Sequence, residues 1–407
     1  MPGPSAARLA GDVMRILTRY IVAEVTGVFV ATLATMTAFM FLALIGKEAV
    51  DNGLGLTPIL RMLPYMLPQA MQFAVPGALL MAATSVYGRV SASNEMTAIK
   101  SLGISPLTLI WPAVLLAGGL SLASVALNDI AVSWGRSGVD RVIVESLEEI
   151  VYGRLRTARS YSNDRIEVNV VNVVDRQMIQ PIIQLRSGDG RPPSLIKADA
   201  AELDADPDAN AITIRLFNAE ADADGWSITH PGEFVRSFPL DELTGRSQTT
   251  RTPSGYALRE IGPAQQRQTE AIEQLKYEMA ADVGAALLWG HLDDVSQTDW
   301  NAKQRELLDR QRWLHRLGTE PHRRWANGFS CLGFVLIGAP LAIRRRHGEF
   351  WGSFFICFLP ILLLYYPMLV GMVDQAKDGS LPPQSVWLGN AVLAGLGAWL
   401  MHRVVRF

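Results

Sequence analysis

Cysteine is almost absent from this chain: its 407 residues include only Cys331 and Cys357. Both lie in apolar stretches, so a disulfide framework and a cysteine-based zinc site are excluded. The histidines do not cluster at metal-ligand spacing. Lysine plus arginine number 37 and aspartate plus glutamate number 39, so the basic excess typical of nucleic-acid binding is also missing. We therefore expect no bound metal and no nucleic-acid partner.

The common catalytic motifs are missing as well. The sequence has no Walker A phosphate-binding loop, no His-Glu-x-x-His and no Gly-x-Ser-x-Gly, so we expect no catalytic residues. The apolar stretches contain few acids, and Glu24 is the only strong candidate for an ion-coupling residue. A single carboxylate near a helix end is typical of the membrane interface. Active transport by this chain would therefore need an energy source on another chain.

Long apolar runs, in contrast, are abundant, although hydrophobic residues make up only 49% of the chain. A helix needs about 20 apolar residues to cross the hydrocarbon core. Pro64, Pro68 and Pro76 are expected to kink or break the second run. The sequence predicts three spans before and three after a polar middle region, at residues 20–45, 58–87 (or 68–87), 106–127, 325–343, 350–373 and 385–401.

Basic residues predict the orientation, because cytoplasmic loops are enriched in lysine and arginine. The N-terminal segment, the loop after the second span, the loop after the fourth span and the C-terminus all carry such residues. If the chain crosses the membrane six times, these four segments all lie on the same side of the membrane. We therefore predict that both termini are cytoplasmic and that the large middle region lies on the opposite, non-cytoplasmic side.

The middle region changes from a strand pattern to a helix pattern. Ile166, Val168 and Val170 alternate with polar residues, and residues 178–185, 211–217 and 232–238 form further short apolar runs. Turn residues separate the runs, which favours a sandwich or jelly roll. Pro181 indicates an edge strand or a bulge. From residue 264 onward, apolar residues recur at helical spacing, which indicates amphipathic helices that cover the sheet or extend the fourth span.

These patterns together predict an α-helical membrane protein with six transmembrane helices and an inserted all-β, jelly-roll-like periplasmic domain. The expected parts are a first membrane half, a β domain, a helical connector and a second membrane half, at residues 1–127, 128–263, 264–322 and 323–407.

Residues 91–104, in the loop after the second span, predict a short amphipathic cytoplasmic helix. Ser91 or Ser93 is the expected cap. Glu95 and Lys100 complement the helix dipole at its two ends, and Gly103 is a natural C-terminal stop. Such a helix suits a groove on a partner protein, or it rests on the membrane surface. Its apolar face contains Met96, Ile99 and Leu102.

Residues 95–105, Glu-Met-Thr-Ala-Ile-Lys-Ser-Leu-Gly-Ile-Ser, resemble the coupling helix of the LptF/LptG permeases of lipopolysaccharide export. The C-terminal half is also similar to this family. Several short segments carry this resemblance together, and no single motif would suffice. This half contains His-Arg-Arg at 322–324, Gly-Ala-Pro-Leu at 338–341, Gly348, Gly-Ser-Leu-Pro-Pro at 379–383 and Trp387. The order of three spans, β domain and three spans is also that of the family.

This resemblance implies a subunit of the bacterial inner membrane that pairs with a second, related permease subunit. Two copies of a cytoplasmic ABC ATPase would bind the coupling helices and hydrolyse ATP, while this chain binds no cofactor. The β domain would pass lipopolysaccharide or a similar glycolipid to a periplasmic jelly-roll bridge protein. Glu95 would meet the ATPase, with Met96 and Ile99 in its groove, and Leu102 and Gly103 would complete the helix.

An anionic glycolipid substrate makes basic residues near the membrane faces candidates for phosphate contacts. They are Arg15, Arg19, Lys47, Arg323 and Arg324. Arg15 and Arg19 are also explained as simple topology signals.

The chain departs from the family at residues 251–320, which are longer and more helical than is typical. Two other interpretations stay open: a membrane anchor that presents the β domain as a scaffold or sensor, and a secondary transporter. The sequence does not distinguish the two sister subunits of the family, or a heterodimer from a homodimer.

Overall fold

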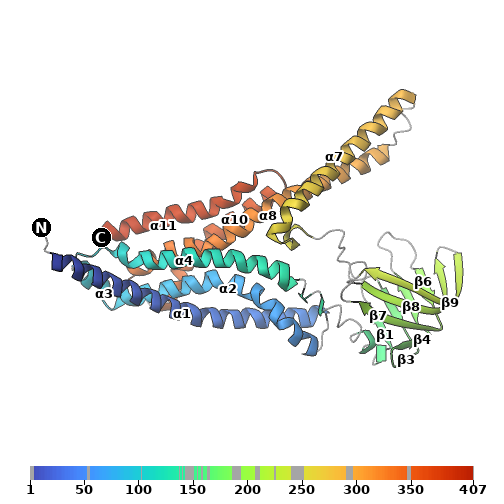
Figure 1. The fold of residues 1–407 in the computed structure, drawn as a ribbon, viewed down its shortest axis with the longest axis horizontal. Helices are drawn as coiled ribbons and strands as arrows, with labels where there is room; N and C mark the ends of the chain where they lie inside the picture. The colour runs from blue at the N-terminus through green and yellow to red at the C-terminus, as the bar shows by residue number, and fades with distance from the viewer. Residues whose placement is uncertain are drawn as a thin grey trace. The chain divides into compact units, whose positions relative to one another are not determined.

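The computed structural model describes residues 4–406 except for 53–55, 102, 137, 140, 143–150, 154, 157–158, 163–165, 186–193, 207–210, 224–225, 240–251, 290–296 and 346–349. The chain forms two compact units. The first contains Met1–Phe41, Leu67–Ser133 and Pro253–Phe407, and the second contains Leu42–Met66 and Trp134–Thr252. Long helices make up most of the first unit, and all the described strands lie in the second (Figure 1).

Five helical segments among the described residues are long and apolar enough to cross a membrane. They are Arg15–Lys47, Ile59–Ala92, Pro106–Arg136, Trp300–Arg344 and Phe354–Lys377. The helices that contain them are α1 (Pro4–Asn52), α2 (Leu56–Ala92), α4 (Pro106–Ile130) with the π-helical η1 (Ala131–Arg136), α8 (Gln297–Arg344), and α9 (Phe350–Pro360), η5 (Ile361–Tyr365) and α10 (Tyr366–Lys377) in succession.

The sixth expected span is occupied by α11 (Leu388–Arg406), which follows the short 3₁₀ helix η6 (Pro383–Trp387). With 19 residues, α11 is shorter than the other spans, and its last turn carries Arg403 and Arg406. It lies where the sequence predicted the sixth span.

The three prolines of the second span do not break it. Pro64, Pro68 and Pro76 all lie inside the continuous helix α2, so the expectation of a break is wrong. Prolines are tolerated in membrane helices because neighbouring helices, side chains and local adjustments satisfy the carbonyl groups that they leave unpaired.

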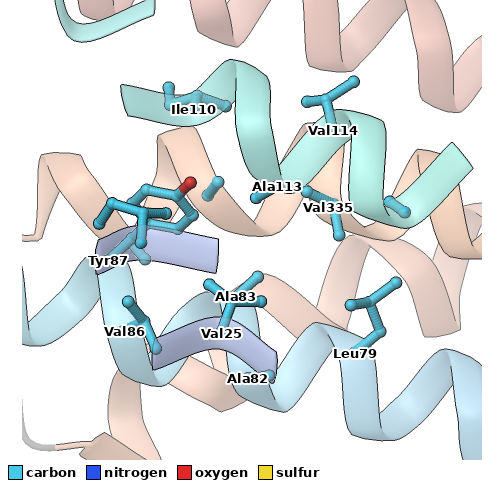
Figure 2. Close-up of a cluster of buried hydrophobic side chains, with 14 of the residues drawn as sticks. Val25, Leu79, Ala82, Ala83, Val86, Tyr87, Ile110, Ala113, Val114 and Val335 are labelled. Carbon is cyan, nitrogen blue, oxygen red and sulfur yellow. The ribbon is translucent and has the colours of Figure 1, made fainter. Parts of the chain in front are cut away.

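The core of the helical unit is a cluster of small and branched side chains. Figure 2 shows Val25 of α1 and Val335 of α8 meeting residues of α2 and α4. Ala82, Ala83 and Ala113 are almost completely buried there, and small residues allow membrane helices to approach closely.

Gly328 marks a close approach of α8 to α4. A Cβ atom on Gly328 would lie 2.4 Å from Val125 Cγ2 and 3.1 Å from Ser121 O, and the β-branched Val125 has little rotamer freedom. We expect Gly328→Ala to lower the free energy of unfolding by about 1–3 kcal/mol, seen as a lower thermal midpoint in detergent. Gly119→Ala is the control, because its Cβ meets nothing within 4 Å. An equal fall in both variants would contradict this packing.

The second unit contains a 9-stranded sheet in which the pairings among the described strands are antiparallel. Its order is β1-β2-β5-β6-β8-β7-β4-β3, with β9 paired to β8. The strands are β1 (Ser160–Ser162), β2 (Ile166–Asn169), β3 (Asn172–Val174), β4 (Gln177–Ile179), β5 (Ile182–Leu185), β6 (Ser194–Lys197), β7 (Ala200–Asp206), β8 (Ala211–Ala223) and β9 (Trp226–Pro239).

The run expected as one strand at residues 178–185 is in fact two strands. Gln180 has a left-handed φ of 48°, and Pro181 follows it. At this corner the chain changes neighbours: β4 pairs with β3 and β7, whereas β5 pairs with β2 and β6. The sheet therefore curls on itself around a core that includes Met178, Ala201 and Leu216. The expected turns at 188–190, 207–208 and 224–225 lie outside the described residues.

A helical hairpin follows the β-rich region. The 3₁₀ turn η3 (Pro253–Gly255) leads into α7 (Leu258–Trp289), which packs along the first part of α8. Gln268 Nε2 donates to Arg310 O at 3.0 Å, and Arg310 Nη1 donates to Ala271 O at 3.1 Å. The helical region thus begins at Leu258 rather than at residue 264. The expected boundary at residues 322–323 falls inside α8, which is one continuous helix of 48 residues.

Candidate functional site

The expected cytoplasmic helix is α3 (Glu95–Ser101). Glu95 lies in its first turn and Lys100 in its last, so the predicted complement to the helix dipole is confirmed. The predicted serine cap is wrong. Ser91 Oγ donates to Ile343 O at 2.7 Å, and Ser93 Oγ lies 2.9 Å from Glu95 Oε1. The turn before α3 is made instead by Asn94, whose φ is 61°.

The apolar face of α3 is turned toward the chain's own helices. Met96 is only 3% exposed and belongs to the core cluster of Figure 2, and Ile99 packs against that cluster. We had expected both side chains to enter a groove on a partner. In this structure Met96 is unavailable for that contact, because the bundle itself buries it. The exposed side of α3 contains Glu95, Thr97, Ala98 and Ser101. Leu102 lies outside the described residues.

Hydrogen bonds fix α3 and its flanking turns to several helices. Lys100 Nζ donates to Val404 O of α11 at 3.4 Å, and Ser91 Oγ reaches α8 at Ile343 O. Just before α3, Tyr87 Oη donates to Leu109 O of α4 at 2.9 Å. α3 is thus bonded to α11, and the end of α2 that leads into it is bonded to α4 and α8.

Glu24 forms an ion pair with Arg89 near the end of α2. The pair links α1 to the segment that leads into α3. This arrangement assigns Glu24 a local partner and removes the reason to consider it as an ion-coupling residue.

Gly103 closes the C-terminus of α3. Its φ is 76°, its N–H donates to Lys100 O at 2.9 Å, and the Ile104 N–H donates to Ile99 O at 3.3 Å. An L-residue pays about 1–2 kcal/mol in this conformation. We therefore expect Gly103→Ala to speed hydrogen exchange of the α3 amides, measured by mass spectrometry. Gly88→Ala, in the interior of α2 with open space around its Cβ, should leave that exchange unchanged. Unaltered exchange in Gly103→Ala would contradict the assignment.

The candidate phosphate-binding residues differ in their surroundings. Arg15, Arg19 and Lys47 are exposed and stay candidates. Arg323 is engaged by Glu320, with its Nη2 2.7 Å from Oε2. Arg324 is wrong as a lipid contact, because its side chain has 0% exposure.

Arg324 is the centre of a buried charge cluster that joins three parts of the helical unit. Its Nη1 lies 3.3 Å from Asp129 Oδ1 on α4. Its Nη2 donates to Tyr256 O at 2.6 Å and to Ser254 O at 3.2 Å. Glu320, itself 1% exposed, lies 3.7 Å from its Nε. Sequence patterns did not reveal this cluster, because Asp129 and Arg324 are 195 positions apart.

The order of the elements, with apolar helices before and after an inserted β-sheet, agrees with the family suggested by the sequence. A comparison with family models matches residues 19–403 to the lipopolysaccharide export system permease LptF/LptG. No curated protein matches the chain. Because the match covers nearly the whole chain, and the helices are long and apolar enough to cross a membrane several times, this protein belongs to the LptF/LptG family of lipopolysaccharide export permeases.

Proposed function

We propose that the chain is a non-catalytic subunit of an ATP-driven exporter, which extracts lipopolysaccharide or a related anionic glycolipid from the inner membrane. The observation that carries this proposal is α3, whose apolar side is packed in the bundle while its polar side is exposed. A helix held in this way transmits a push to the bundle, because it cannot slide over the surface that buries Met96.

The exposed side of α3 has the chemistry of a protein contact. Glu95 is exposed, and its Oε1 is held by Ser93 Oγ at 2.9 Å. A carboxylate oriented in this way suits a basic residue of a cytoplasmic ATPase. The small side chains of Ala98 and Ser101 lie on the same side and leave room for a partner to approach. ATP would bind to that ATPase.

The sheet has features suited to passing lipid to a bridge of similar fold. Among the described strands, β9 pairs only with β8, so its other edge is open to a further strand. β9 is long, and its Ile228 and Val235 are 67% and 53% exposed. We propose that this edge receives a strand of the periplasmic bridge protein. This requires the sheet to be periplasmic and both termini to be cytoplasmic, as the distribution of basic residues indicates.

Purification from the native membrane tests the proposal. The full chain, isolated in mild detergent, should co-purify with a cytoplasmic ATPase and a second permease subunit, or a second copy of itself, identified by mass spectrometry. The reconstituted complex should release lipopolysaccharide from proteoliposomes only when ATP is hydrolysed. Purification without any ATPase would favour the anchor interpretation. Lipid transport that continues after ATP depletion would favour a secondary transporter.

A further inference from the structure

The Arg324 cluster is connected to α3 through two helices. α4 begins at Pro106, just after the turn that ends α3, and carries Asp129 near its last residue, Ile130. α8 accepts the Ser91 hydrogen bond at Ile343 near its end and carries Glu320 and Arg324 further back along the same helix. Ser91 lies in the last turn of α2, and Met96 of α3 itself shares a buried cluster with Ile343 of α8. A displacement of α3 would therefore act on both helices that supply the acidic and basic members of the cluster.

The same cluster holds the start of the α7–α8 hairpin. Asp129 Oδ1 accepts a hydrogen bond from Leu258 N, the first residue of α7, at 2.8 Å. Arg324 binds the carbonyl groups of Ser254 and Tyr256, which directly precede α7. One carboxylate thus bonds both the buried arginine and the N-terminus of α7, where negative charge is favourable.

The cluster also offers Arg324 two carboxylates at different distances. Asp129 lies 3.3 Å from Nη1 and is 32% exposed, whereas Glu320 lies 3.7 Å from Nε and is 1% exposed. Arg323 also binds Glu320, on the same helix. If α4 shifts, Arg324 therefore keeps Glu320 as a charge partner while it loses Asp129. The arrangement with Asp129 is the one observed, and the arrangement without it would be the second state that conformational coupling between distant sites requires.

We propose that the Arg324 cluster is a joint through which movement of α3 repositions the α7–α8 hairpin. This inference rests on the proposed function, since a partner ATPase must move α3. It assigns a role to the α7–α8 hairpin, for which the sequence patterns indicated none. Asp129 and Arg324 would act as positioning residues, without touching lipid or nucleotide.

Spin labels can test the joint in the complete complex. One label is placed at Tyr277→Cys, which is 77% exposed on α7, and the other at Leu122→Cys, which is 54% exposed on α4. The two native cysteines are buried, which limits their labelling. The distance distribution is compared without nucleotide and after vanadate trapping of the ATPase. We expect trapping to shift the distribution, and Asp129→Ala to remove that shift.

Transport gives a second readout of the same variant. With Asp129→Ala, ATP-dependent lipid release should fall about fivefold or more, while co-purification of the ATPase is retained. If Asp129→Ala does not fold, Arg324→Lys replaces it in both measurements. A lysine keeps the positive charge at this position, but its single ammonium group cannot bond all the present partners of the guanidinium group. The matched control is Asp309→Ala, which removes an acid from an exposed pair on α8 and should change neither readout.

A wild-type complex whose label distances do not respond to trapping would overturn the joint. The joint would also be overturned if folded Asp129→Ala or Arg324→Lys showed a normal shift of the label distances after trapping together with normal lipid transport. Failure of the proposed function is a separate outcome, because then no ATPase co-purifies with the wild-type chain.

Discussion

Glu95→Arg is expected to abolish association of the chain with its ATPase while leaving the membrane domain folded. The Glu95 side chain is exposed and accepts a hydrogen bond from Ser93, also an exposed residue, so we expect the fold not to depend on it. An arginine there would face the basic residue that a carboxylate-binding socket provides. Like charges brought together at an interface cost several kcal/mol. The measurement is co-purification of the ATPase from membranes in mild detergent.

Two further variants make this test specific. Glu95→Gln keeps the size of the side chain and removes only its charge, so it should weaken association less than Glu95→Arg. Glu278→Arg makes the same charge reversal at an exposed position of α7 and should leave association intact. Undiminished association of Glu95→Arg would show that α3 is not the ATPase contact, even if the chain proves to be a transporter.

The apolar runs identified the membrane helices well, because a spanning helix must be apolar over a length set by the bilayer. The ends of these helices were less predictable. The sequence placed the start of the fourth span at residue 325, where the charged stretch ends, but α8 continues through this point from Gln297. Pro321 lies inside α8, so a proline in the charged segment did not mark a helix end.

The strands were predicted where apolar residues alternate clearly, as in β2, and where the strand is long, as in β8 and β9. β1 and β3 have only three residues each, which is too short for a period of two to stand out. β7 has seven residues but reads Ala-Ala-Glu-Leu-Asp-Ala-Asp, with little apolar alternation. Its pairing with β8 along its whole length stabilises it through contacts that local sequence does not record.

In the coupling-helix segment, the helical pattern predicts which side chains share a face but not which part of the molecule packs against that face. The spacing of Met96 and Ile99 correctly indicated one shared face, but periodicity does not say what covers that face. Here the bundle covers it, through helices distant in the sequence. The Arg324 cluster has the same limitation, because a buried ion pair between remote positions leaves no local signature. The sequence made Arg323 and Arg324 candidates for phosphate contacts, yet Arg324 is completely buried.

Arg324→Met is expected to lower the free energy of unfolding by about 3–5 kcal/mol, the usual result of removing one partner from a buried ion pair. Methionine fills similar space with a flexible apolar chain. It leaves the Asp129 carboxylate without its cation and the carbonyl groups of Ser254 and Tyr256 without this donor. Glu320 is affected less, because Arg323 still binds it. Equilibrium unfolding by denaturant in detergent micelles measures the change.

Two further variants separate the cost of removing a buried arginine from the cost of leaving its partner's charge uncompensated. Arg312→Met removes an arginine of α8 that is 60% exposed and 3.6 Å from the exposed Asp309, so its cost should stay below about 1 kcal/mol. Adding Asp129→Asn to Arg324→Met removes the uncompensated negative charge and keeps an oxygen for the Leu258 N–H, so part of the lost stability should return. If Arg324→Met and Arg312→Met were equally mild, Arg324 would not be the buried charge that holds α4, α7 and α8 together.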